Sequence, residues 1–223
     1  MAINVADNVA NIVASIGALG TASFGLVDAT KVFGGGVSLF GLGFIDNLVK
    51  SFLKDKAEAA RVRGTLRANW INGAPLADQK AIAKSLIKVR LSKATARVFA
   101  AAAAVDAGTL EKVAQKLESQ AAMAPDESDC FGRFDLALTA SLDDAYNHAD
   151  QRYRNAAKLI AMAVAVVLAI AGLLVINPEN LDLRDISLAV LCGLLATPLA
   201  PIAKDVASAL QAGVKVAQTV VRK

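Results

Sequence analysis

Two long runs of uncharged, apolar residues near the C-terminal end are the feature that most limits the folds open to this chain. Residues 159–176 read LIAMAVAVVLAIAGLLVI, and residues 186–203 read ISLAVLCGLLATPLAPIA. A helix of eighteen residues is about 27 Å long, close to the roughly 30 Å hydrocarbon core of a bilayer. Neither run has a polar stripe, so such a helix needs lipid or complete burial around it. We predict a two-helix transmembrane hairpin over residues 158–204; the alternative is a buried hairpin in a soluble core.

The segment between the two runs, NPENLDLRD at residues 177–185, fits the turn of such a hairpin. Pro178 cannot continue the first helix, because proline lacks a backbone donor and clashes with the preceding turn. Asp182 and Asp185 can each cap the second helix, since carboxylates suit a helix N-terminus.

The basic residues around the hairpin predict its orientation, because Lys and Arg prefer the cytoplasmic side of short loops. The turn has only Arg184, whereas the outer flanks of the hairpin carry Arg152, Arg154, Lys158 and Lys204. We therefore predict a multi-pass protein of the cytoplasmic membrane, the inner membrane of a bacterium. Asn180 would face outward, and Lys84, Lys223 and the C-terminus would face the cytoplasm.

Residues 1–45 form a hydrophobic, glycine-rich segment whose pattern differs from that of the two runs. One helical face is apolar, and Asn, Ser, Ala and Gly occupy the other; the apolar face holds Val9, Ile12, Val13, Ile16 and Leu19. This amphipathic pattern favours an interfacial or re-entrant element, with a true span and a soluble core helix as alternatives. The glycine-rich stretch at 32–45 does not match a phosphate-binding loop, because no lysine and hydroxyl follow its last glycine, Gly43. The first seven residues hold an acid and no base, so we expect no cleaved signal peptide.

Residues 46–157 predict a charged α-helical cytoplasmic domain. Aromatic residues make up only 5% of the chain, and no alternating strand pattern is evident. Helical spacing predicts helices over 46–70, 76–91 and 93–104, a short helix capped by Thr109, a linker at 121–129, and a long helix from near Ser128 into the first apolar run. One face of this long helix is apolar and holds Phe131, Phe134, Leu138, Leu142 and Tyr146. The predicted fold class is all-α: a membrane helical hairpin, a helical cytoplasmic domain and an N-terminal amphipathic or re-entrant segment.

Charge is distributed unevenly along this domain. Residues 50–97 hold 12 basic and 3 acidic residues, a net charge of +9, whereas residues 99–150 hold 3 basic and 10 acidic residues, a net charge of −7. One interpretation is that the two segments pair with each other. The other is that Lys80, Lys84 and Lys88, one turn apart, form a basic stripe at the membrane surface, each contributing about 1 kcal/mol against anionic lipid. Nucleic acid is an unlikely partner, because few aromatic side chains are available to stack on bases.

Residues 205–223 predict a C-terminal amphipathic helix, which a kink at Pro198 and Pro201 separates from the second run. Three small residues repeat there at four-residue spacing, a pattern that lets helix backbones approach in lipid: Ala209, Gly213 and Ala217. The N-terminal amphipathic face also has no evident partner within one chain. We therefore expect a homo-oligomer in the membrane.

No residue pattern predicts catalysis, a cofactor or a metal site. His148 is the single histidine, and Cys130 lies eighteen residues before it on the same predicted helix, which places the two about 27 Å apart. A nucleophile and its base must lie within hydrogen-bond reach, so this pair does not qualify. We expect Cys130 and Cys192 to be free thiols.

The resulting prediction is a structural membrane protein rather than an enzyme. It would anchor a helical cytoplasmic domain to the bilayer, and would self-assemble or dock a larger complex through that domain. The alternative is an oligomeric pore or channel, in which the glycine-rich N-terminal segment lines a water path.

Overall fold

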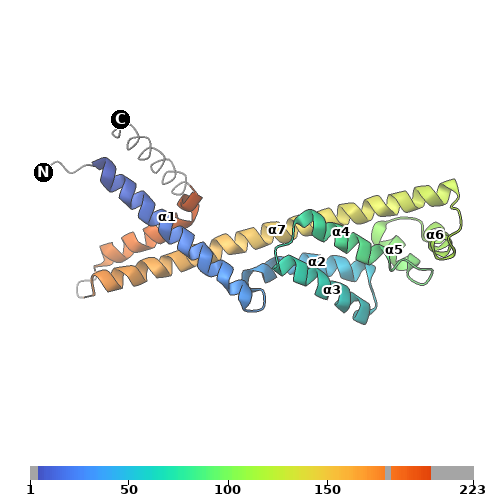
Figure 1. Cartoon of the computed structure of the whole chain (residues 1–223), viewed down its shortest axis with the longest axis horizontal. Helices are drawn as coiled ribbons and strands as arrows, with labels where there is room; N and C mark the ends of the chain where they lie inside the picture. The colour runs from blue at the N-terminus through green and yellow to red at the C-terminus, as the bar shows by residue number, and fades with distance from the viewer. Residues whose placement is uncertain (1–4, 179–181, 202–223) are drawn as a thin grey trace, which may run out of the picture. The chain divides into compact units, whose positions relative to one another are not determined.

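The computed structural model describes residues 5–178 and 182–201, with side chains from residue 12 onward. Within these ranges the fold is all-α, as predicted, and contains no strand (Figure 1). The elements are α1 (Val5–Ala29), η1 (Thr30–Val32), η2 (Gly36–Ser38), α2 (Leu39–Phe52), α3 (Lys56–Ile71), α4 (Leu76–Lys88), α5 (Ala96–Ala103), α6 (Ala107–Ser119), α7 (Pro125–Ile176) and a last helix, Leu183–Pro201. The predicted C-terminal helix at 205–223 lies outside the described residues.

The chain forms two compact units. We call Met1–Val37 with Arg154–Lys223 the apolar unit, and Ser38–Tyr153 the helical domain. Residues 38–45, which we grouped with the N-terminal membrane segment, belong to the helical domain. Trp70 explains this boundary, because its indole Nε1 donates to the backbone oxygen of Ser38 at 2.7 Å and so fixes the start of α2 in that domain.

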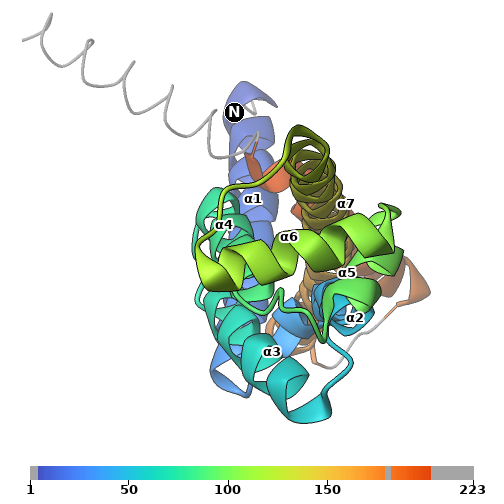
Figure 2. The same cartoon turned by 90° about the vertical axis from the view of Figure 1, so that its right-hand side faces the viewer.

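In the helical domain, α2 to α6 lie alongside the N-terminal part of α7 (Figure 1). Figure 2 shows α6 from the side while α7 is seen nearly end-on, so α6 lies crosswise to α7. The apolar face predicted for the long helix is confirmed, because these α7 side chains are buried in the core: Phe134, Leu138, Leu142 and Tyr146. The rings of Phe99 on α5 and Phe134 stack with their centroids 6.0 Å apart. Aromatic and aliphatic burial along α7 thus holds the domain together.

The single helix predicted over 46–70 is wrong: the chain breaks between α2 and α3. Leu53 is extended, and the Asp55 carboxylate accepts a hydrogen bond from the backbone N–H of Glu58 at 2.7 Å. This is an N-cap, with an acid three residues later that also favours a helix start. Apolar spacing continued across the break, and for that reason periodicity alone did not reveal it.

Two other helix starts also differ from the predictions. Asp106, not Thr109, caps α6: its carboxylate accepts from the Thr109 N–H at 2.7 Å. The predicted linker at 121–129 is shorter than expected, since α7 already begins at Pro125. Proline suits the first helical position because its missing N–H would have no helical partner there. The prediction that one helix continues into the first apolar run is confirmed, because α7 is unbroken to Ile176.

Candidate functional site

The apolar unit contributes long helices that could cross a membrane. Among the described residues there are three such segments: Ile12–Val32, the C-terminal part of α7 and Leu183–Pro201. Only 22%, 11% and 17% of the residues in their apolar windows are buried. A hairpin buried in a soluble core would show the opposite, so these helices present apolar surface that needs lipid or another protein.

The N-terminal segment also contains a helix that could span. We favoured an interfacial or re-entrant element with a true span as an alternative, and α1 is a continuous helix from Val5 to Ala29, long and apolar enough to span. Its hydroxyl groups do not oppose insertion. Thr21 and Ser23 donate to the backbone oxygens of Gly17 and Leu19, at 3.0 and 2.7 Å, so the helix itself satisfies them.

Small residues bring the helices of the apolar unit close together. A Cβ atom on Gly20 of α1 would overlap the backbone of Ala196 and the side chain of Ala200. Likewise, a Cβ atom on Gly193 would overlap the backbone of Val166 on α7. The last helix, Leu183–Pro201, thus packs against α1 at Gly20, whereas Ile12, Ile16 and Leu19 of the predicted N-terminal apolar face line an open groove.

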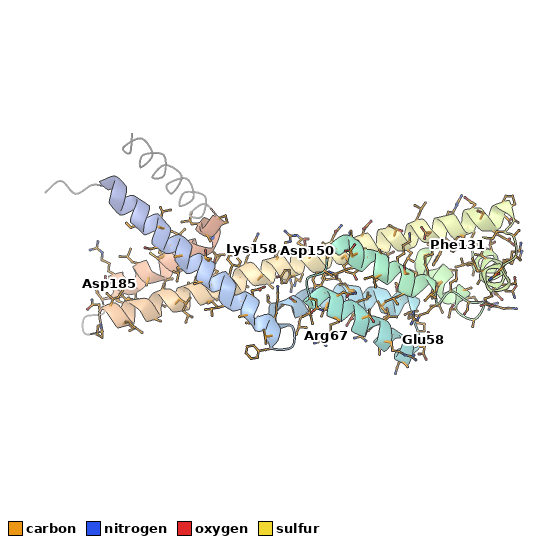
Figure 3. All side chains as sticks on the ribbon, in the orientation of Figure 1. Glu58, Arg67, Phe131, Asp150, Lys158 and Asp185 are labelled. Atoms are coloured by element: carbon orange, nitrogen blue, oxygen red, sulfur yellow. The ribbon has the colours of Figure 1, made fainter. Side chains whose placement is uncertain are left out.

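An open groove of about 960 Å³ also lies among these helices. Its lining is mostly aliphatic, from α1, α7 and Leu183–Pro201, and its polar members are Ser15, Asp185 and Cys192. Asp185 lies near the start of Leu183–Pro201 (Figure 3). A groove with this lining fits hydrocarbon better than water.

The lysines predicted as a basic stripe face acidic residues of α7. Lys84 Nζ and Lys88 Nζ lie 2.7 and 2.8 Å from the two carboxylate oxygens of Asp135, and Lys80 Nζ lies 2.8 Å from Asp143. Between 24% and 33% of each lysine side chain is exposed. Lys88 also lies over the ring of Phe131, 4.9 Å from its centroid. These contacts match the interpretation in which the basic and acidic segments pair within one domain.

This pairing changes the electrostatics of α7. Hydrogen bonds from Lys84 and then Lys88 hold the pKa of Asp135 below its usual value. At the start of α7, Glu127 accepts from Lys116 Nζ and from the Ala124 N–H, and these contacts lower its pKa in the same direction. Both carboxylates are therefore charged at neutral pH, and they hold α4 and α6 against α7.

The two residues weighed for chemistry lie apart. The ring of His148 stacks on Phe44 with centroids 5.4 Å apart, and its Nε2 lies 3.3 Å from Asp144. Cys130 is buried, and burial raises the pKa of its thiol, which disfavours the reactive thiolate. Among the described residues no group of His, Cys, Asp and Glu side chains could hold a metal ion.

Sequence reasoning did not single out Asp135 as the partner of Lys84 and Lys88. The only signal was a shared spacing: Asp135 and Asp143 are eight residues apart, as are Lys80 and Lys88. The residues predicted to pack an oligomer, Ala209, Gly213 and Ala217, lie outside the described residues. Comparison with known proteins adds no assignment: no family model, curated protein or solved structure matches this chain.

Proposed function

We propose that this protein is an integral membrane scaffold. Three helices anchor it in the cytoplasmic membrane, and the helical domain stands at the inner face, where it binds further copies or a larger complex. This proposal extends the two-helix hairpin to three spans, because α1 has the length and apolarity to cross as well.

The observation that carries the proposal is the composition of α7. One half of this helix buries Phe134, Leu138 and Tyr146 in the core of the helical domain, while the apolar window of the same helix is only 11% buried. The chain thus passes from folded domain to apolar segment within one helix, without a loop. Such a junction suits a protein whose task is to fix a domain to a bilayer.

Charge near the helix ends supports the orientation. The described turn holds the acids Asp182 and Asp185 beside Arg184, whereas Arg154 and Lys158 precede the apolar window of α7. Because basic residues favour the cytoplasmic side, we place the helical domain and the C-terminus inside. With three spans, the N-terminus and the turn at 177–182 are outside.

The competing function is an oligomeric pore, favoured by the open groove among the three spans. Its described lining offers few polar groups to replace the hydration of an ion. Purified protein in sealed vesicles distinguishes the two functions: a scaffold leaves the ion permeability at the level of protein-free vesicles, and a pore raises it.

Alkaline extraction of membranes tests the anchor itself. An integral scaffold stays in the membrane pellet after a carbonate wash, as lipid-buried helices cannot be released by breaking ion pairs. Release into the supernatant, together with a soluble monodisperse protein, would contradict the proposal.

Self-association is the further part of this proposal. The small residues at 209, 213 and 217 would let C-terminal helices of neighbouring copies approach. The mass in mild detergent and in nanodiscs should exceed that of a monomer, and Gly213→Leu should lower it. A wild-type protein that is monomeric in every detergent and in nanodiscs would rule this part out.

A further inference from the structure

A second groove lies in the helical domain, between α2 and α3. Its volume is about 490 Å³, and it is open to solvent. One wall carries two arginines from α3, and the other carries apolar residues from the first turns of α2. Neither wall includes a lysine of the basic stripe on α4. The charged residues of this groove are therefore separate from that stripe.

The cationic wall consists of Arg63 and Arg67, which lie one helical turn apart and so on the same face of α3. Figure 3 labels Arg67 toward the C-terminal end of α3 and Glu58 toward its start. Arg63 Nη2 donates to Asp46 Oδ2 at 2.8 Å, yet its Nε is buried without a hydrogen-bond partner in the described part of the chain. A guanidinium has five N–H donors and matches phosphate geometry. The lining holds two arginine side chains and one aspartate, Asp46.

The apolar wall consists of Leu39, which is 42% exposed, and Leu42, which is buried. Trp70 and the tight packing of Gly41 against Ala149 fix the backbone here. Leu39 therefore presents exposed apolar surface from a rigid base. Apolar residues beside a cationic wall match the two parts of a phospholipid.

The place of the groove in the chain agrees with such a ligand. The first candidate span ends at Val32 and α2 begins at Leu39, so residues 33–38 alone connect them. Six residues reach at most roughly 20 Å when fully extended. If Ile12–Val32 crosses the bilayer, the start of α2 lies within that reach of the inner surface.

Two glycines keep the groove open. Gly43 on α2 and Gly64 on α3 both line it, and a Cβ atom on either would meet no atom within 4 Å. A larger side chain at Gly64 would thus fill the groove without displacing the backbone, which provides a clean way to block it.

We infer that the α2–α3 groove binds the headgroup phosphate of an anionic phospholipid, with Arg63 and Arg67 on the phosphate and Leu39 toward the acyl chains. The inference rests on the proposed membrane function. Each arginine near an anionic surface contributes on the order of 1 kcal/mol, which corresponds to about a five-fold change in affinity.

The lipid site can be tested by native mass spectrometry of the full chain in detergent, with phosphatidylglycerol or phosphatidylcholine added. The wild type should retain phosphatidylglycerol in preference to phosphatidylcholine. The pair Arg63→Gln with Arg67→Gln should lose about five-fold in affinity for each arginine removed. Arg61→Gln, on α3 but not in the lining, and Gly132→Leu, in an open position on α7, serve as controls.

Gly64→Leu provides an independent block, because it leaves both arginines in place and fills the groove. Loss of the lipid preference in this variant, with an unchanged circular dichroism spectrum, supports the inference. Wild-type retention in both Gly64→Leu and the double arginine variant would overturn it. Competition by inorganic phosphate at equal strength would show a small-anion site rather than a lipid site, and would also overturn it. If the double arginine variant loses its lipid but stays in the membrane pellet after alkaline extraction, both the lipid site and the proposed membrane anchor are supported. Release of the wild type by the same wash would refute the membrane anchor alone.

Discussion

Gly20 of α1 lies so close to Ala196 of the last helix that a Cβ atom on the glycine would overlap the alanine carbonyl oxygen. Glycine is therefore required here by the approach of two backbones, not by a turn. In lipid, where water gives helices no hydrophobic reason to associate, such close van der Waals contact is a main source of packing energy. The contact makes α1 part of the apolar unit rather than a separate surface helix.

Gly20→Leu should destabilise the apolar unit. Forcing a large side chain into a filled contact costs typically about 1–3 kcal/mol, and more when backbone must move. Gly25→Leu on the same helix is the matched control, since a Cβ there meets nothing within 4 Å. The resistance of each variant to unfolding by added dodecyl sulfate measures the effect. Equal resistance of the two variants would mean that α1 does not pack against Ala196.

Asp135→Asn should loosen α4 from α7. The carboxylate pairs with both Lys84 and Lys88, so its loss leaves two lysines without their anion. Partly exposed pairs of this kind contribute up to about 1 kcal/mol. Hydrogen exchange of α4 amides should accelerate several-fold, whereas Asp129→Asn, in the exposed pair with Arg133, should leave it unchanged.

Acid should weaken the helical domain through the same residue. The pKa of Asp135 is lowered in the folded state, so its contribution is fully present above the unfolded pKa of about 3.9 and is lost as the pH falls below that value toward the folded pKa. Fluorescence of Trp70, the single tryptophan, reports unfolding. Between pH 6 and about pH 3, the wild type should lose more stability than Asp135→Asn; parallel curves would contradict the assignment.

Tyr146→Phe should leave stability unchanged or raise it slightly. The side chain is fully buried, its hydroxyl has no hydrogen-bond partner among the described residues, and burial raises its pKa to about 12. Burying a hydroxyl costs about 1–3 kcal/mol in lost hydration, and no hydrogen bond in the described structure offsets that cost here. Removing the hydroxyl removes the cost. A free energy of unfolding lowered by more than about 1 kcal/mol would indicate a bound water at this hydroxyl.

The sequence was most informative where one physical rule acts locally. No proline interrupts the chain between Pro125 and Ile176, so the unbroken α7 and its buried face could be predicted. The two apolar runs were also recognisable, because uniform apolarity over eighteen residues is rare in a soluble helix. The break at Leu53 was missed because apolar spacing continued across it, although Asp55 and Glu58 form a helix-start pattern.

Contacts between distant segments could not be predicted in the same way. The four-residue spacing of Lys80, Lys84 and Lys88 defines one face of a helix but not the surface that this face meets. Whether these lysines turn toward lipid or toward Asp135 depends on tertiary packing. The role of Gly20 likewise depends on Ala196, which lies 176 residues further along the chain.

Membrane topology tests the central claim most directly. Single cysteines at Ala2, Ser119 and Asn180, on a background carrying Cys130→Ala and Cys192→Ala, can be labelled in intact cells with a membrane-impermeant maleimide. We predict labelling at positions 2 and 180 without permeabilisation, and at position 119 only after it, because the helical domain is inside and one span separates position 119 from each of the other two sites. Labelling of position 119 in intact cells, or protection of positions 2 and 119 together, would contradict a three-span anchor with a cytoplasmic helical domain.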